Sequence, residues 1–572
     1  MTPMKRRGLK SFFAVAAFSA STALASAAVL QPTIVAGVPR GAGMRDLGRA
    51  GATVRIDLVF LLKYRNDAEL GALIAAQGDE ASPLHGNFLT SQQFRDAFSP
   101  TPQTYERAIA LLKHAGFSVT GTNRSRTALD VSASAPVVER YFNTEIHRIM
   151  VDGSAGIRYA NARPAILPNE LRGTVDGVLG FDTIEWFKPL YRVLPRSIVL
   201  PSIPDTKIGQ PLRGPDGGFG PLAFVQGYNF PVQHQIAGKP NGTTYDGTGH
   251  AAGIAIPADP ADSDLTTFLN FYKVKRTGKT TRVPVDGGPH SPSGGAQLEA
   301  ALDYETIAGA APGAAVFIYE FNQFTAKEVV DTYDAAVDDN KVDTLNSSFG
   351  ACETSGFFTP QGIAHAFKQG VAQGQVFHAS TGDSGTFTFG CSSTVSVQTP
   401  ADTPFTTAIG GTALTVDTKG NYVSEQYWND STGAGGGGVS KIFPLPSFQK
   451  HVKGVTTTGR NIPDVSYDAS AITGEDIVFS GTFGVIGGTS LASPLFGACI
   501  VEAEQVLGKR VGNLNPALYS HWLKDGYGSG KSLLAHDITT GSAFGILVPQ
   551  KGYDLATGIG TLDCFNASTK LL

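Results

Sequence analysis

The segment Ala251-Ala-Gly-Ile-Ala-Ile256 is a short apolar run with the length and composition of a buried β-strand. A second apolar run, Ala315-Val-Phe-Ile-Tyr319, has the same character. Helical patterns lie between and after these runs, over residues 297–309, 325–337 and 362–373. Because strands that alternate with helices form a parallel sheet covered on both faces, residues 222–572 are predicted to form one α/β domain.

Residues 28–193 carry a separate pattern of strands and helices. A strand is expected over 54–61, and amphipathic helices are expected over 104–116 and 135–142. These elements predict a small α+β domain. The segment 194–221 is rich in Pro and Gly, which is typical of an exposed linker that proteases cut easily.

Residues 1–27 have the layout of a secretory signal peptide. Lys5, Arg6 and Arg7 precede an apolar run, and Ala25-Ser-Ala27 offers a small-residue cleavage site. The apolar run is shorter than the roughly 20 residues needed to span a bilayer. We therefore expect an exported, extracellular protein that keeps no membrane segment after signal cleavage.

The amino-acid composition excludes some classes of protein. Of the 572 residues, 42% are hydrophobic and only 16% are charged, with a formal net charge of −4. This supports a large folded core and argues against a disordered chain. No basic block follows Lys5-Arg-Arg7, so nucleic-acid binding is not expected. A protein with few ionised carboxylates has fewer charged contacts to lose when these groups are protonated, which suits a protein that stays folded in acid. The chain is also expected to be a monomer.

Four cysteines are present, at positions 352, 391, 499 and 564, and an exported protein can form disulfides with them. The sequence alone leaves three pairings open. Cys352 and Cys391 lie in segments rich in Gly, Ser and Thr, and they are the preferred pair. Cys499 lies in an apolar helical run, where we expect a buried free thiol.

Gly487-Gly-Thr-Ser-Leu-Ala-Ser-Pro494 presents Ser490 on a small-residue turn before an apolar helix. A serine at a helix N-terminus has backbone N–H groups nearby that can stabilise an oxyanion. Taken alone, the pattern also fits an ordinary capped helix start. As a nucleophile, Ser490 would need a general base. His250 lies just before the apolar strand and is expected to be a structural or surface residue rather than a catalytic one.

Two acidic residues offer a base without histidine. Glu299 and Asp303 are spaced i, i+4, so both point from one face of the helix over 297–309. Two carboxyl groups that close share a titration, which leaves one of them with a raised pKa. A solvated acidic face is the alternative, but this helix is poor in Lys and Arg.

A third acid, Asp383, follows the apolar residues 376–377 and is flanked by Gly382 and Gly385. The carboxyl end of a strand is where α/β sheets place ligands. A protonated Asp383 could donate a hydrogen bond to an oxyanion, as other neutral acids do. An Asp turn is the simpler explanation of this position taken by itself.

In this order, Glu299-x-x-x-Asp303, Gly382-Asp-Ser-Gly385 and Gly488-Thr-Ser490 resemble the sedolisins, the serine-carboxyl peptidases. The resemblance implies a subtilisin-like α/β fold and peptide hydrolysis at acidic pH through an acyl-enzyme. It assigns the roles of nucleophile to Ser490, base to Glu299, partner of that base to Asp303 and oxyanion-hole donor to Asp383.

Ser82-Pro-Leu-His-Gly-Asn-Phe-Leu-Thr90 resembles the activation propeptide of the same family. The resemblance implies that residues 28–193 form a ferredoxin-like propeptide that inhibits the enzyme. It also implies that processing occurs in the linker 194–221. The expected partners are protein or peptide substrates and the chain's own propeptide.

Asp537-Ile-Thr-Thr-Gly541 and Gly552-Tyr-Asp-Leu-Ala-Thr-Gly558 resemble the family's site for one structural Ca²⁺. The resemblance implies carboxylate ligands from Asp537 and Asp554. It implies backbone carbonyl ligands from Ile538, Gln550 and Gly552.

The sequence thus predicts a secreted, acid-active serine endopeptidase made as a self-processing zymogen. A tripeptidyl aminopeptidase of the same fold is one alternative, because the end wall of the cleft is not visible in sequence. A non-catalytic homologue kept as a binding module is another, although every triad residue is present. An ordinary histidine-dependent subtilase would need a His-Gly-Thr-His motif, which the sequence lacks.

Overall fold

The structure, a computed structural model, describes residues 34–35, 43–154, 156–200, 209–236, 242–290, 292–355, 359–391 and 395–570. The expected signal peptide, residues 1–27, lies outside these ranges, and so does the middle of the linker 194–221. Within the described ranges, no helix is both long enough and apolar enough to cross a membrane.

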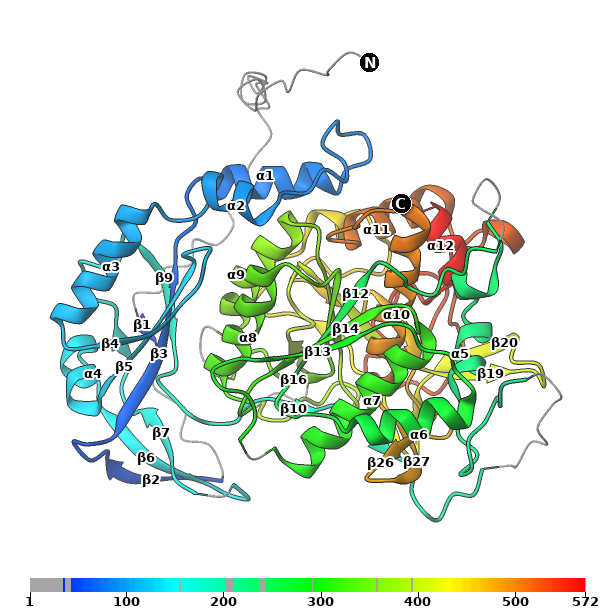
Figure 1. The fold of residues 1–572 in the computed structure, drawn as a ribbon, viewed down its shortest axis with the longest axis horizontal. Helices are drawn as coiled ribbons and strands as arrows, with labels where there is room; N and C mark the ends of the chain where they lie inside the picture. Colours follow the sequence, from blue (N-terminus) through cyan, green and yellow to red (C-terminus); the bar gives the residue numbers. More distant parts are fainter. Residues whose placement is uncertain are drawn as a thin grey trace. The chain divides into compact units, whose positions relative to one another are not determined.

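The larger domain is built on an eight-stranded sheet with the strand order β13-β14-β12-β15-β17-β19-β20, and β25 also pairs with β19 (Figure 1). Every pair is parallel except β19 with β20. The strands are β12 (Ala251–Ile256), β13 (Thr280–Pro284), β14 (Ala315–Glu320), β15 (Thr344–Ser347), β17 (Val376–Ser380), β19 (Thr406–Val416), β20 (Tyr422–Tyr427) and β25 (Val465–Asp468). The continuous burial of β12 is what a strand covered on both faces requires.

Helices cover both faces of this sheet (Figure 1). On one face, α7 (Gly294–Ala310) packs against α10 (Thr489–Leu507), and α6 (Asp262–Tyr272) packs against α7. On the other face, α8 (Ala326–Asp339) packs against α9 (Thr359–Ala372). The predicted α/β architecture is therefore confirmed, and the expected helices lie within α7, α8 and α9 to within a few residues.

Shorter elements complete this domain. They include α5 (Pro221–Gly227), β16 (Phe349–Cys352), β18 (Gln398–Thr399), β21 (Asn429–Asp430), β22 (Gly433–Ala434), β23 (Gly438–Val439), β24 (Asn461–Ile462), β26 (Glu475–Phe479), β27 (Thr482–Gly487), α11 (Asn515–Asp525), β28 (Ala535–His536), β29 (Thr561–Leu562) and α12 (Cys564–Lys570). Two more short strands, β10 (Lys188–Pro189) and β11 (Arg192–Val193), belong to the segment that precedes the larger domain in sequence. They pair with β16 and β27 respectively.

The N-terminal domain is a four-stranded antiparallel sheet with the order β4-β5-β3-β9. Its elements are β3 (Arg55–Leu62), α1 (Asp67–Gln77), α2 (Ser91–Ala97), α3 (Pro102–His114), β4 (Ser118–Thr122), β5 (Ala128–Ser134), α4 (Ala135–Phe142) and β9 (Val175–Leu179). The order strand, helix, strand, strand, helix, strand is the ferredoxin-like arrangement that the sequence predicts. A small sheet of β2 (Met44–Arg49), β6 (Ile146–Val151) and β7 (Arg158–Asn161) extends it.

Strand β3 joins two cores because successive side chains of a strand point to opposite faces. Leu58 and Phe60 lie in the core of the N-terminal domain. Val59 and Leu61 belong to the core that includes the larger domain. On that side β3 contacts α8, and β9 contacts α9. Strands β3 and β9 thereby attach the N-terminal domain to the helices α8 and α9 of the α/β domain.

Two disulfides are present. Cys352 pairs with Cys391, as preferred from sequence. Cys499 pairs with Cys564, so the expectation of a free buried thiol at Cys499 is wrong. The reason is tertiary: α10 and α12 pack together and bring the two Cα atoms to 5.7 Å, a proximity that a separation of 65 residues does not reveal.

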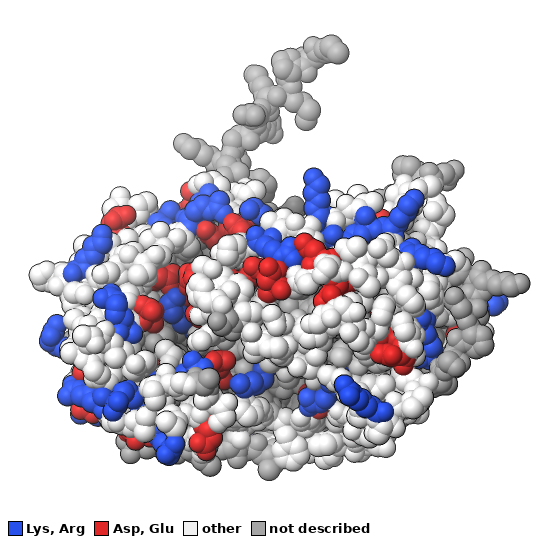
Figure 2. Space-filling view, turned by 60° about the horizontal axis from the view of Figure 1, so that its bottom comes forward, with Lys and Arg blue, Asp and Glu red and all other residues white. Residues whose placement is uncertain are grey.

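Charged side chains are scattered over the face drawn in Figure 2, and wide uncharged areas separate them. Several basic groups lie along its upper rim, and acidic groups lie close below them. This distribution follows from the low charged content of the sequence.

Candidate active site

Ser490 lies in the first turn of α10, directly after the turn that follows β27. Gly488 makes that turn possible, because its φ of 100° lies in a region that favours glycine. A Cβ atom at position 488 would also collide with the carbonyl oxygen of Leu190 and lie 2.7 Å from Oδ2 of Asp383. The small-residue motif therefore lets other backbone and carboxyl groups approach the serine closely.

The hydroxyl of Ser490 donates to a carboxylate. Its Oγ lies 2.8 Å from Oε2 of Glu299 and 3.0 Å from the carbonyl oxygen of Ser348. Glu299 projects from α7, which packs directly on α10, and both side chains are fully buried. The helix pair thus brings together two residues that are 191 positions apart in sequence.

Asp303 lies one turn after Glu299 on α7 and is also fully buried. Its Oδ1 accepts a hydrogen bond of 2.6 Å from the Ser348 hydroxyl, which in turn accepts one of 2.8 Å from the Asn346 amide. Oε1 of Glu299 and Oδ2 of Asp303 are buried and have no hydrogen-bond partner among the described residues. Each acid therefore keeps one oxygen that can hold a proton.

Burial controls the protonation of this pair. It raises the pKa of Glu299 well above its ordinary value, the charge of Asp303 raises that pKa further, and the hydrogen bond from Ser490 lowers it. Burial also raises the pKa of Asp303 well above its ordinary value, while hydrogen bonds from Ser348 and Asn346 lower it. Because two buried carboxylates cannot both be ionised cheaply, the pair keeps a proton at pH values at which exposed carboxyl groups have lost theirs.

Asp383 follows β17, beyond Gly382, whose φ is 114°. Its Oδ1 accepts hydrogen bonds of 2.8 Å from both the backbone N–H and the hydroxyl of Thr489. Its Oδ2 is buried without a hydrogen-bond partner among the described residues. Burial raises the pKa of Asp383 to about 6, and the charge of Arg192 opposes that rise. A protonated Oδ2 would be a donor beside the backbone N–H of Ser490.

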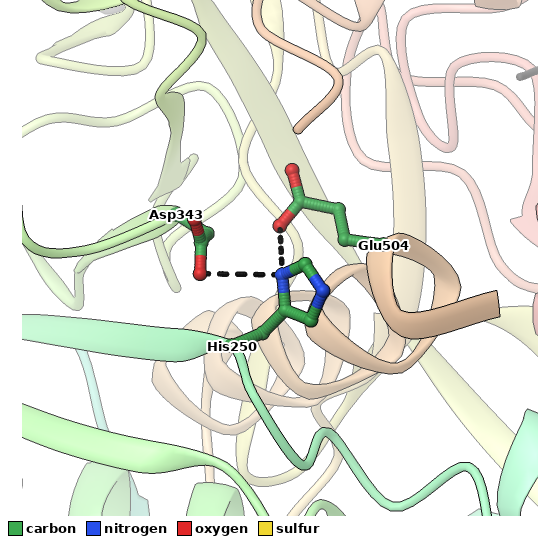
Figure 3. Close-up of side chains that lie close together, drawn as sticks. All are labelled: His250, Asp343 and Glu504. Carbon is green, nitrogen blue, oxygen red and sulfur yellow. Dashed lines mark ion pairs between the residues drawn. The ribbon is translucent and has the colours of Figure 1, made fainter. Parts of the chain in front are cut away.

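His250 points toward Asp343 and Glu504, as Figure 3 shows. Its Nδ1 lies 3.3 Å from Oδ2 of Asp343 and 3.7 Å from Oε2 of Glu504. Burial lowers the pKa of His250, but the two acidic partners raise it more strongly, to about 9. Arg510 also binds Asp343, with Nε 2.6 Å from Oδ1. His250 is therefore part of an ion-pair cluster before β12, and the hydroxyl of Ser490 binds Glu299 and the Ser348 carbonyl instead.

The loops expected to bind calcium also converge. The N–H of Gly552 lies 3.2 Å from both carboxylate oxygens of Asp537, and the N–H of Gln550 donates to Asp554 at 2.7 Å. No hydrogen bond between described residues ends on the carbonyl oxygens of Ile538, Gln550 or Gly552. Two carboxylates and three free carbonyls in adjoining loops fit the oxygen ligands that Ca²⁺ prefers.

Sequence reasoning missed three polar residues that build the site. Ser348 binds both Ser490 and Asp303, Asn346 binds Ser348, and Thr489 fixes Asp383. A usable signal was present for the first two, because Asn346-Ser-Ser348 lies at the carboxyl end of β15 (Thr344–Ser347), where α/β sheets place ligands. The role of Thr489 depends on where Asp383 lies, which only the fold decides.

Known proteins with related sequences share this organisation. A family model described as the pro-kumamolisin activation domain matches residues 42–184, and a subtilase family model matches residues 287–526. Sedolisin from Pseudomonas sp. (strain 101) is 30% identical over 541 residues, which cover 90% of this chain and 86% of that protein. The chain belongs to the sedolisin family.

Two other relatives and one solved structure extend the comparison. Kumamolisin from Bacillus sp. (strain MN-32) is 28% identical and covers 90% of this chain and 91% of its own. Tripeptidyl-peptidase 1 from Mus musculus is 24% identical and covers 91% and 92%. The structure of Pseudomonas sedolisin (serine-carboxyl proteinase) complexed with two molecules of pseudo-iodotyrostatin matches with a TM-score of 0.54, at 30% identity. It covers 62% of this chain and 97% of its own. This sedolisin-family chain is thus a serine-type peptidase with an activation domain.

Proposed function

We propose that this sedolisin-family chain is a secreted, acid-active endopeptidase that is made as a self-processing zymogen. The observation that carries the proposal is the 2.8 Å hydrogen bond from the Ser490 hydroxyl to Glu299 inside a buried site. Among the described residues, the partners of that hydroxyl are Glu299 and the Ser348 carbonyl, and neither is an imidazole.

In the proposed reaction, Oγ of Ser490 attacks the carbonyl carbon of a peptide bond while Glu299 accepts the hydroxyl proton. Asp303 shares the charge and proton of Glu299. The N–H of Ser490 and a protonated Asp383 stabilise the oxyanion. The bond to the leaving nitrogen then breaks, and Glu299 returns the proton to the amine. A water molecule, activated by the same carboxylate, hydrolyses the ester and regenerates Ser490.

The carboxyl groups support activity in acid. Asp383 donates only when protonated, and its pKa of about 6 favours the protonated form below that pH. The raised pKa values of Glu299 and Asp303 keep a shared proton on the pair in the same range. An imidazole base would instead lose its function on acidification.

Cleavage within a chain is supported by the backbone that crosses the site. Strand β10 lies before Leu190 and strand β11 lies after it, so extended backbone is held on both sides of Ser490. The relative from Mus musculus is named tripeptidyl-peptidase 1. An enzyme that removes tripeptides from an N-terminus would close the cleft three residues before the cut. Cleavage of substrates with blocked N-termini distinguishes these two activities.

Export and calcium binding are part of the proposal. Two disulfides suit an oxidising compartment, which agrees with a signal peptide over residues 1–27. Asp537 and Asp554, with the carbonyls of Ile538, Gln550 and Gly552, would hold one Ca²⁺. The ion would neutralise the two carboxylates and cross-link the loops that carry them.

The test is a pH–activity profile on denatured protein for the wild type, Ser490→Ala and Glu299→Gln. We expect an acidic optimum, no activity for Ser490→Ala, and a loss of about a hundredfold to ten-thousandfold for Glu299→Gln. Glu305→Gln is the matched control, because Glu305 is a buried carboxyl on the same helix that binds the N–H of Val478 instead. Full activity of Glu299→Gln would refute the role of Glu299, and no activity of the wild type at any pH would favour the binding-module alternative.

A further inference from the structure

The segment that leaves the N-terminal domain crosses the active site as an extended strand. Before the site, Lys188 and Pro189 pair antiparallel with Gly350 and Phe349 of β16. After the site, Arg192 and Val193 pair antiparallel with Gly487 and Ile486 of β27. The chain thus adds an edge strand to each of two short sheets, which is how extended peptides bind in many recognition sites. Leu190 and Tyr191 lie between the two pairings, next to Ser490.

The peptide groups of Leu190 bind the catalytic residues directly. Its N–H lies 3.1 Å from the Ser348 carbonyl oxygen and 3.0 Å from Oε2 of Glu299. Its carbonyl oxygen accepts a 3.0 Å hydrogen bond from the N–H of Ser490. The Leu190 carbonyl is therefore held by the same N–H that the proposed reaction uses to stabilise an oxyanion.

The second oxyanion donor is also beside this carbonyl. A Cβ atom built on Gly488 would meet both the Leu190 carbonyl oxygen and Oδ2 of Asp383, so both oxygens border the space above Gly488. That Oδ2 is buried and has no hydrogen-bond partner among the described residues. The Leu190 carbonyl oxygen thus already accepts a hydrogen bond from the N–H of Ser490. The carboxyl group of Asp383, which becomes a second donor when protonated, lies next to it.

Residues on both sides of Leu190 fix the register. The Leu190 side chain is buried, at 9% exposed. Arg192 donates hydrogen bonds of 3.0 Å to the Asp383 carbonyl oxygen and the Ser384 hydroxyl. Leu194 continues the pairing, because its N–H lies 2.9 Å from the carbonyl oxygen of Val485. A shift by one residue would break all these contacts and turn the buried leucine to the other face of the strand.

We infer that Leu190–Tyr191 is the peptide bond that this protein cleaves first in its own chain, which rests on the proposed function. Oγ of Ser490 adds to the Leu190 carbonyl carbon, and Glu299 accepts the hydroxyl proton. The carbon–nitrogen bond breaks, and Tyr191 leaves as an amine with that proton. Water then hydrolyses the Leu190 ester, which leaves a free Leu190 carboxyl group and the serine hydroxyl. The same register predicts the substrate class of this site. The substrates would be extended peptides with an apolar residue directly before the cut and a basic residue two positions after it.

This bond lies upstream of residues 194–221, in which the sequence predicts processing. The experiment acidifies the purified full-length precursor and follows the earliest fragments by intact mass and N-terminal sequencing. We expect the first pair to end at Leu190 and begin at Tyr191. A first pair cut within 194–221, with Leu190–Tyr191 still intact, would overturn the inference and make this segment an inhibitor only.

Three variants sharpen the experiment. Leu190→Asp places a carboxyl group in the buried position and is expected to slow the first cleavage by about a hundredfold. Leu190→Met keeps an apolar side chain of similar size, so the rate of the first cleavage is expected to stay close to that of the wild type. Val199→Asp is the matched control, because Val199 is 89% exposed and lies further along the connecting segment. Equal rates for Leu190→Asp and Val199→Asp would contradict the inference.

Two further measurements separate the possible failures. Melting curves of Leu190→Asp in the Ser490→Ala background show whether this precursor still folds. Activity of the wild type on an unrelated denatured protein tests the proposed function independently. A wild type that degrades that protein but cuts itself elsewhere refutes only the bond assignment, whereas a wild type without either activity refutes the proposed function.

Discussion

At the scale of single residues, the carboxyl group of Asp383 is in an environment that favours its neutral form. One oxygen is held by two donors from Thr489. The other is buried beside the Leu190 carbonyl without a hydrogen-bond partner among the described residues, and Nη1 of Arg192 lies 3.8 Å from it. Burial raises the pKa of Asp383 to about 6. The proton therefore resides on the group below that pH, in the state that can donate to an oxyanion.

The pH dependence of Asp383 variants follows from this assignment. In the wild type, kcat/KM is expected to fall as pH rises through about 6, because the donor loses its proton there. Asp383→Asn carries an amide donor at every pH, so this decrease should move to higher pH. Asp383→Ala has no donor and should lose about a hundredfold to a thousandfold in kcat/KM. Identical pH profiles for the wild type and Asp383→Asn would contradict the role of Asp383.

At the scale of secondary-structure elements, α10 organises the α/β domain. It is buried along most of its length and contacts α7, α12 and several strands of the main sheet. Its N-terminal turn carries Ser490, and its middle is linked to α12 through Cys499 and Cys564. The same helix therefore positions the nucleophile and carries one end of the disulfide that closes the loop between residues 499 and 564.

Removal of this disulfide should lower the stability of the protein. In the inactive Ser490→Ala background, Cys499→Ser and Cys564→Ser are each expected to reduce the free energy of unfolding by about 2–5 kcal/mol. The double variant should cost about as much as either single one, because both single changes break the same bond. Denaturant unfolding measures all three. Additive costs would indicate two independent thiols.

The loops between β28 and β29 depend on the proposed calcium ion in a similar way. At a concentration about 100 times Kd, an ion that binds only the folded state contributes about 2.7 kcal/mol. A chelator should therefore lower the Tm of the Ser490→Ala precursor by a few degrees, and Asp537→Asn should abolish that response. Asp525→Asn, an exposed acid on α11, is the control. A Tm that does not change when a chelator is added, together with no calcium found by elemental analysis, would contradict the proposed site.

At the scale of the whole molecule, the activation domain packs on the α/β domain through one apolar face of strand β3, and polar contacts surround that face. Tyr64 stacks on His365, with ring centroids 4.3 Å apart. Asp338 at the end of α8 accepts hydrogen bonds of 2.9 Å from the backbone N–H groups of Arg124 and Ser125, and a 2.5 Å bond from the Ser125 hydroxyl. Asp338 thereby accepts three hydrogen bonds from this loop of the activation domain, and Asp339 and Gln369 bind the same loop through Arg124 and the Ser125 hydroxyl.

Loss of the Asp338 carboxylate should speed the release of the activation domain. Asp338→Asn exchanges an acceptor for an amide donor, so at least one backbone N–H of the loop loses its partner. A hydrogen bond to a charged group contributes about 1.5–3 kcal/mol, which corresponds to about a tenfold to hundredfold weaker association. The lag before activity appears after acidification should shorten accordingly. Asp339→Asn, at a more exposed ion pair with Arg124, is the control and should change the lag little.

Local patterns determined the individual elements of this protein. The apolar run 251–256 became β12, and the amphipathic pattern over 135–142 became α4 with the expected bounds. The i, i+4 spacing of Glu299 and Asp303 was enough to place both carboxyls on one helix face. These predictions succeed because the periods of helices and strands follow from covalent geometry and neighbouring residues.

Only the tertiary structure decided which elements meet. It joined Cys499 to Cys564, placed Ser348 between Ser490 and Asp303, and laid Leu190 across the nucleophile. These contacts connect segments tens to hundreds of residues apart, and they arise from the packing of α7, α10 and the sheet into one core. No local pattern encodes them, because the burial that holds such segments together is a property of the assembled core and acts without regard to distance along the chain.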